Sequence, residues 1–203
     1  MRVRVRLLPA GVDLAGPALH AANHTGYLDI LIVLSVTPGV FISKAGVLWL
    51  PLMGQLAAVG GTLFVNRAHR LAVVSLIGKV RRTLRAGTSV IFFPEATSSD
   101  GKGLLPFKTS LFEAARAQGG HGFPVRPIVL CYRTVAGRPI DDSNRSCVFW
   151  YGGANLARHL WRMMAAPGVD VDVKVLPERR LSGDRGAFAT ELRDEMLDEL
   201  TSP

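Results

Sequence analysis

The stretch Asn23-His24-Thr25-Gly26-Tyr27-Leu28-Asp29 leads directly into the apolar run Ile30–Val36. Histidine titrates close to neutral pH, and a carboxylate that holds one ring nitrogen fixes its tautomer, so H-x4-D is typical of a general base with its orienting acid. Residues i and i+5 of one helix are about 140° apart and do not share a face. A contact between His24 and Asp29 therefore requires a turn, which Gly26 permits, and it places Asp29 near the start of the next helix. A histidine with a structural role only is the alternative.

Apolar segments of strand and helix character alternate along the chain. Strands are predicted at Arg2–Leu8, Ala18–Ala22, Val40–Ser43, Thr62–Asn66, Ser89–Phe93, Pro127–Tyr132, Cys147–Tyr151 and Val169–Val175, and helices at Asp29–Val36, Leu48–Ala58, Arg70–Ala86, Thr109–Gln118, Leu156–Met164 and Phe188–Leu200. In the helix Arg70–Ala86 we expect Leu71, Val74, Ile77 and Leu84 near one face. This order predicts an α/β fold, in which a single domain (residues 1–203) forms a sandwich of helices around a mixed, mostly parallel sheet.

The charge of the chain is positive and unevenly distributed. The 203 residues carry 24 Lys and Arg against 16 Asp and Glu, a net charge of +8, yet residues 1–180 alone have a net charge of +12. Either this is ordinary surface charge, or it is a basic face for anionic lipid headgroups or the phosphates of an acyl carrier, with Arg81, Arg82 and Arg85 as candidate contacts. No recognisable nucleic-acid-reading module accompanies the charge, so nucleic acid is not an expected partner.

The sequence shows no metal-site spacing and no apolar stretch near the ~20 residues that span a bilayer. Met1–Leu8 alternates basic and apolar residues and lacks the apolar core of a signal peptide. Cys131 and Cys147 fall in predicted strands, and we expect them to be small core residues rather than a disulfide or a metal site. A reducing compartment is therefore the default expectation. No Gly-x-Ser-x-Gly is present, which disfavours an α/β-hydrolase.

Four blocks of the sequence, in order, resemble the glycerolipid acyltransferase family of 1-acylglycerol-3-phosphate acyltransferases. They are His24–Asp29, Gly61–Arg67, Phe93–Ser99 and the proline-containing apolar block Val125–Leu130. Ala96 stands where the family usually has glycine, and Ser98 where it usually has arginine. The tracts Thr97–Lys108 and Trp150–Trp161 look more like the lyso-ornithine-lipid acyltransferase branch. Members of the family often carry hydrophobic membrane-docking helices before the first block, and none is evident here. We therefore expect either that the protein docks on the membrane by another surface or that an N-terminal segment has been lost.

The resemblance implies an acyl transfer from acyl-CoA or acyl-carrier protein, as co-substrate, to the hydroxyl of a lysolipid. His24 would be the general base and Asp29 its orienting acid. Arg67 and Lys44 would bind an anionic headgroup, and Glu95 and Thr97 would shape the acceptor site by hydrogen bonds. A surface arginine and a turn carboxylate that accepts backbone hydrogen bonds are the structural alternatives for Arg67 and Glu95.

The same resemblance implies a peripheral enzyme at the cytoplasmic face of an anionic membrane, without a metal or redox cofactor. A catalytically decayed lipid-binding protein and a thioesterase-like hydrolase are the alternatives. The neutral Ser98 favours a lyso-ornithine acceptor over lysophosphatidic acid, whose phosphomonoester carries close to two negative charges. Arg126 or Arg133, brought in by the fold, would weaken that inference.

Overall fold

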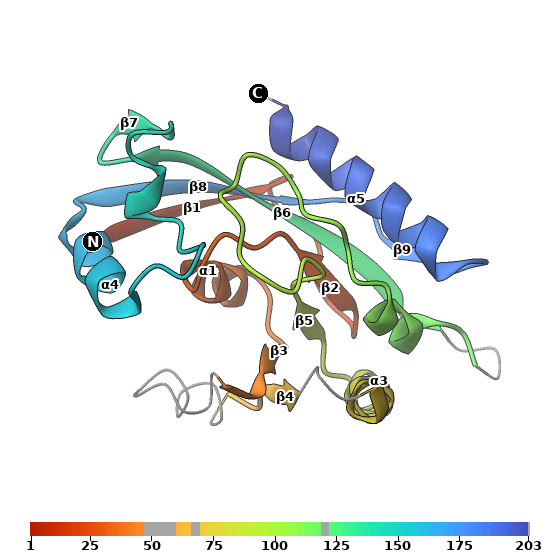
Figure 1. Cartoon of the computed structure of the whole chain (residues 1–203). Helices are drawn as coiled ribbons and strands as arrows, with labels where there is room; N and C mark the ends of the chain where they lie inside the picture. Colours follow the sequence, from red (N-terminus) through yellow and green to blue (C-terminus); the bar gives the residue numbers. More distant parts are fainter. Residues whose placement is uncertain (47–59, 66–69, 119–121, 203) are drawn as a thin grey trace.

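The computed structural model describes residues 1–46, 60–65, 70–118 and 122–202, and is built on one sheet of nine strands (Figure 1). The main path of the sheet runs β1-β8-β6-β2-β5-β3-β4, and β7 and β9 pair with β6. The strands are β1 (Arg2–Leu8), β2 (Leu19–Ala22), β3 (Val40–Lys44), β4 (Leu63–Val65), β5 (Val90–Phe92), β6 (Pro124–Val135), β7 (Arg138–Pro139), β8 (Gly168–Val175) and β9 (Arg179–Arg180). Along the main path only β6 and β8 are antiparallel, so the predicted mixed, mostly parallel α/β sheet is confirmed.

Helices cover both faces of the sheet. The α-helices are α1 (Leu28–Val36), α3 (Arg70–Arg85), α4 (Leu156–Ala165) and α5 (Arg185–Thr201), with 3-10 helices η2 (Ser110–Ala115) and η3 (Arg145–Cys147). Buried side chains of α3, η2 and α5 pack with Phe92 and Val129 of the strands. Buried side chains of α1 and α4 pack with the alternate strand residues Ile91 and Ile128. Because strand side chains alternate between faces, α1 and α4 lie on the face opposite α5, as Figure 1 shows.

Several predicted elements differ from those observed. Thr109–Gln118 is expected to be an α-helix, but only the 3-10 helix η2 forms there. Cys147–Tyr151 is not a strand, because the backbone N–H groups of Val148 and Phe149 donate to the Arg145 carbonyl in the η3 turn. The side chains of Val148 and Phe149 are nevertheless part of the core. Cys147 accordingly lies in η3, and both cysteines are free thiols. The predicted helix Leu48–Ala58 lies wholly outside the described residues.

Helix α3 buries part of the face predicted for it: Leu84 is buried and Ile77 packs against the core, as expected. Leu76, Val80 and Leu84 are buried at four-residue spacing, whereas Leu71 is 83% exposed and Val74 is exposed as well. Within the part of the chain that the structure describes, no helix combines the length and the apolar character needed to cross a bilayer.

Candidate functional site

The loops that follow the parallel strands bring the predicted site residues to one edge of the sheet. β2, β5, β3 and β4 are parallel neighbours, and β6 runs parallel to β2 on its other side. Their carboxyl ends therefore meet at one edge, where α/β proteins place their ligands. His24 follows β2, the segment Phe93–Ser99 follows β5, and Lys44 ends β3.

His24 and Asp29 form the contact that the H-x4-D spacing predicts. His24 Nδ1 lies 2.9 Å from Asp29 Oδ2, and Asp29 is in the first turn of α1. The carboxylate accepts a hydrogen bond, so Nδ1 carries the proton and Nε2 is left as the basic nitrogen. The side chain of Asp29 is fully buried, while that of His24 is 20% exposed. The pair therefore presents one basic imidazole nitrogen at a partly open position.

Asp29 organises the whole turn that carries His24. Its Oδ2 also accepts the backbone N–H groups of Thr25 (2.6 Å) and Gly26 (2.9 Å). Its Oδ1 accepts the hydroxyls of Thr25 (3.0 Å) and Tyr132 (2.5 Å). Gly26 is required by a close approach, since a Cβ there would meet Trp150 N at 3.1 Å. Five donors around one buried carboxylate fix its position.

Tyr132 of β6 joins the candidate site by a contact that the sequence does not reveal. Its hydroxyl donates to Asp29 although the two residues are 103 positions apart, and burial, reinforced by the Asp29 charge, raises the pKa of Tyr132 well above its usual range. The phenol thus remains a neutral donor at any physiological pH. No sequence signal marks this residue, because it lies in the extension of β6 beyond the proline block.

The segment after β5 clamps the backbone on both sides of His24. Glu95 accepts the His24 N–H through Oε1 and the Leu105 N–H through Oε2, both at 2.8 Å. Ser99 donates its N–H (2.8 Å) and its hydroxyl (3.2 Å) to the His24 carbonyl. Burial raises the pKa of Glu95 above its ordinary value. Glu95 thus accepts backbone hydrogen bonds and positions His24, and its predicted role in shaping the acceptor site stays a prediction.

Asn23 ties the same turn to β6. Its side-chain amide donates to the Leu130 carbonyl (3.1 Å) and its Oδ1 accepts the Leu130 N–H (2.7 Å). Asn23 is 2% exposed. Its pair of side-chain hydrogen bonds extends the contact between β2 and β6 one residue beyond Ala22, the last residue of β2. The residue before His24 is thereby fixed to the strand that supplies Tyr132.

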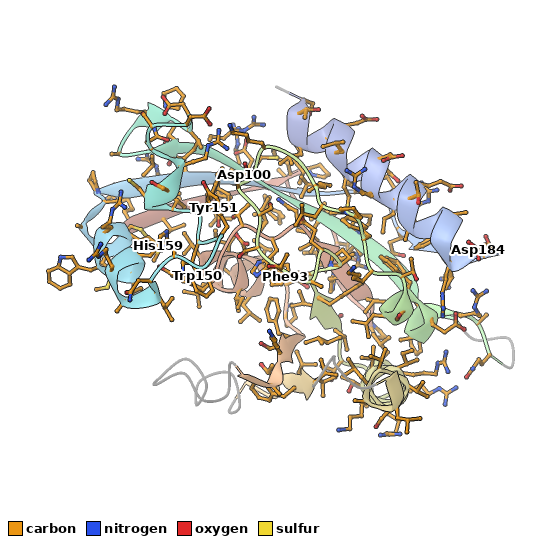
Figure 2. All side chains as sticks on the ribbon, viewed as in Figure 1. Phe93, Asp100, Trp150, Tyr151, His159 and Asp184 are labelled. Atoms are coloured by element: carbon orange, nitrogen blue, oxygen red, sulfur yellow. The ribbon has the colours of Figure 1, made fainter. Side chains whose placement is uncertain are left out.

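Phe93 connects His24 to an apolar pocket. Phe93 stacks on His24 with ring centroids 4.0 Å apart and also lines this pocket of about 260 Å³. Figure 2 shows Phe93 at the centre of the molecule, on the side of α1. The other lining residues are mostly apolar, and they include the exposed cation Lys108. Lys108 was not singled out in the sequence analysis, although its tract belongs to the lyso-ornithine-like pattern.

The other predicted ligand-binding residues are only partly placed. Lys44 and Thr97 are exposed and Ser98 is half-buried, all at the same edge of the sheet, while Arg67 lies outside the described residues. Ala96 adopts φ of +64°, a left-handed conformation that suits the glycine usual in the family.

Neither arginine that was expected to replace the missing charge reaches the site. Arg126 is an ion-pair partner of Glu178 at the opposite end of β6 and donates to the Leu14 carbonyl at 3.1 Å. Arg133 pairs with Asp172 at 2.8 Å. Across the described ranges no cluster of three or more His, Cys, Asp or Glu is arranged to hold a metal ion.

The family model described as Acyltransferase matches residues 3–131. The chain belongs to this family. It is 35% identical over 177 residues to the lyso-ornithine lipid O-acyltransferase of Rhizobium meliloti, covering 85% of this chain and 60% of the relative. It is 32% identical over 198 residues to the 1-acyl-sn-glycerol-3-phosphate acyltransferase of Neisseria gonorrhoeae, covering 93% of this chain and 74% of the relative.

A solved structure has the same fold. The crystal structure of the 1-acyl-sn-glycerophosphate acyltransferase from Thermotoga maritima matches with a TM-score of 0.63 at 22% identity, over 100% of this chain and 73% of that chain. The chain spans about 60% of the length of its lyso-ornithine relatives, from Rhizobium meliloti and Brucella abortus. The predicted family is thereby confirmed.

Proposed function

We propose that this protein transfers a fatty acyl group from acyl-CoA or acyl-carrier protein to the hydroxyl of a lysolipid at the cytoplasmic face of a membrane. The observation that carries the proposal is the imidazole of His24, held by Asp29 and stacked on Phe93, which also lines an apolar pocket. The pocket matches an acyl chain, and the basic Nε2 matches the proton that an attacking hydroxyl must lose.

The reaction is a direct transfer. His24 Nε2 removes the proton of the acceptor hydroxyl while the hydroxyl oxygen attacks the carbonyl carbon of the acyl thioester. The carbon–sulfur bond then breaks, and the leaving thiolate takes a proton from the His24 imidazolium. Asp29 stabilises the imidazolium, and Tyr132 and the turn amides stabilise Asp29. The H-x4-D pattern supplies no serine or cysteine nucleophile, so an acyl-enzyme is not part of the scheme.

The charges around the site support a weakly anionic acceptor. Ser98 is neutral, and Arg126 and Arg133 are occupied by Glu178 and Asp172. Lys108 places one positive charge on the pocket wall. Lys44 and Lys108, the site's cations among the described residues, together with the predicted Arg67, balance the single carboxylate of an ornithine-type lysolipid without the additional arginine that a phosphomonoester site usually has at position 98. We therefore propose a lyso-ornithine lipid ahead of lysophosphatidic acid.

The test is turnover by the purified protein with each lysolipid and either acyl donor. Wild-type protein should form the diacyl product, and His24→Ala should lower kcat by about 10²–10⁴-fold while remaining folded. Near-wild-type turnover by His24→Ala would exclude the mechanism. Free fatty acid released at the same rate without lysolipid would indicate the thioesterase, and no turnover with any donor would indicate the decayed lipid-binding protein. A higher kcat/KM for lysophosphatidic acid would refute the acceptor preference alone.

A further inference from the structure

Helix α4 exposes apolar side chains where a surface helix is normally polar. Only His159 and Met163 of this helix are buried, and they face the core that also contains α1. Trp161 is 78% exposed, and Leu160 and Met164 are exposed beside it. With 3.6 residues per turn these three side chains share one face, on the solvent side of the helix. That face has no packing partner within the described residues.

Helix α1 also exposes apolar side chains, on the same face of the sheet as α4. Leu31 is 62% exposed and Leu34 is exposed, and the only charged residue of α1, Asp29, is buried. Both helices cover the same face of the sheet, and the Tyr27 hydroxyl lies 2.8 Å from His159 Nδ1, which joins the start of α1 to α4. Figure 2 shows Trp150 and His159 in this region. We call Leu31, Leu34, Leu160, Trp161 and Met164 the α1–α4 face.

The charges around the α1–α4 face are positive. Arg158 and Arg162 are exposed on α4, and α4 contains no acidic residue. Five acidic residues lie instead on α5, at the opposite face of the sheet: Glu191, Asp194, Glu195, Asp198 and Glu199. An anionic surface would therefore attract the side of the molecule that carries α4.

We propose that the α1–α4 face docks on a bilayer that contains anionic lipids, a proposal that rests on the proposed lysolipid acyltransferase function. Tryptophan sits favourably at the level of the headgroups, and the apolar stems of arginine allow its charge to reach phosphates while the helix lies flat. A second copy fits this surface less well, because a two-fold contact would bring four arginines together. α1 begins at Leu28, four residues after His24, so docking through this face brings the site to the lipid surface.

Vesicle sedimentation tests the docking surface. Vesicles of phosphatidylcholine with phosphatidylglycerol should bind wild-type protein more tightly than phosphatidylcholine alone. The double variant Trp161→Ala/Met164→Ala should lower the partition coefficient by roughly tenfold or more. The matched control is Leu71→Ala/Val74→Ala, which removes two exposed apolar side chains from α3 and should change binding less than about twofold. Arg158→Glu/Arg162→Glu should abolish the preference for anionic vesicles, whereas Arg82→Glu/Arg85→Glu should retain it.

Wild-type binding by the α4 variants, or a loss confined to the α3 variants, would overturn the proposal. So would a wild-type dimer that Trp161→Ala/Met164→Ala converts to a monomer in light scattering. Turnover of lysolipid in detergent micelles separates this test from that of the function, because it needs no bilayer. Micellar turnover without vesicle binding refutes the docking surface, and vesicle binding without turnover refutes the enzymatic function.

Discussion

Asp29→Asn removes the negative charge beneath His24 while leaving a side chain that the structure can accommodate. Oδ2 faces three N–H donors, from His24, Thr25 and Gly26, so the amide nitrogen of an asparagine cannot take that side. Oδ1 faces two hydroxyls, of Thr25 and Tyr132, which can rotate to accept from an amide. The asparagine carbonyl therefore still receives the His24 Nδ1 proton. The donors around Oδ2 therefore preserve the imidazole tautomer in this variant.

The expected loss is the electrostatic stabilisation of the imidazolium. Two unit charges about 4 Å apart at an effective dielectric constant of about 20 interact with about 4 kcal/mol. Each 1.36 kcal/mol in the barrier is tenfold in rate. Because the imidazolium exists only once the proton has been taken from the acceptor, the loss should fall on kcat, by roughly 10³-fold, with KM nearly unchanged.

Steady-state kinetics with saturating acyl donor and varied lysolipid measure this effect, and circular dichroism confirms folding. The matched control is Asp198→Asn, which changes an exposed acid on α5 and should leave kcat within about twofold. A folded Asp29→Asn protein with kcat reduced less than tenfold would refute the reasoning, because the carboxylate would then serve only to hold the turn.

Three further predictions concern residues around the turn. Tyr132→Phe removes one hydrogen bond to the Asp29 carboxylate and should lower kcat roughly tenfold at constant KM. An unchanged kcat would show that the Tyr132 hydroxyl contributes only to folding. Burial, with a smaller effect of Arg126, lowers the pKa of His20 to about 3, so the unfolded chain binds the proton first as the pH falls. Stability is therefore complete above pH ~6.5 and should fall by about 2 kcal/mol between pH 7.5 and 5 in urea unfolding, with a weaker dependence in His20→Gln. Ala96→Gly should raise stability by up to about 1 kcal/mol, because glycine relieves the left-handed conformation; a loss in urea unfolding would contradict this.

The sequence predicts those parts of the fold that depend on local pattern. The alternation of β1 and the length of α3 are evident from nearby residues, and the H-x4-D spacing requires the turn that the structure contains. The buried face of α3 was predicted correctly at Leu84 but not at Leu71 and Val74, because apolar residues at helical spacing occur on more than one side of the helix and only packing on the sheet decides which are buried.

The candidate site is predictable where its residues are close in sequence and not where they are distant. The His24–Asp29 contact spans five residues, and the positions after β5 follow from the strand pattern. The Tyr132 bond to Asp29 and the ion pairs of Arg126 and Arg133 depend on register across the sheet. The backbone hydrogen bonds of Glu95 also depend on distant positions, because one of its two donors is the amide of Leu105 and the other that of His24, 71 residues before it.

The two hydrogen bonds between Asn23 and Leu130 have a consequence for the order in which the chain folds. The turn that carries His24 is anchored on a strand more than a hundred residues later, and the hydroxyl that completes the Asp29 shell comes two residues after that anchor. A ribosome adds about 5–20 residues per second, so the first-made segment waits at least ~5 s for its partner strand. Such distant pairings are slow to form because their loops must close first. We therefore expect the nascent chain to be inactive until β6 has been made, and hydrogen exchange should protect the His24 turn and β6 in the same kinetic phase.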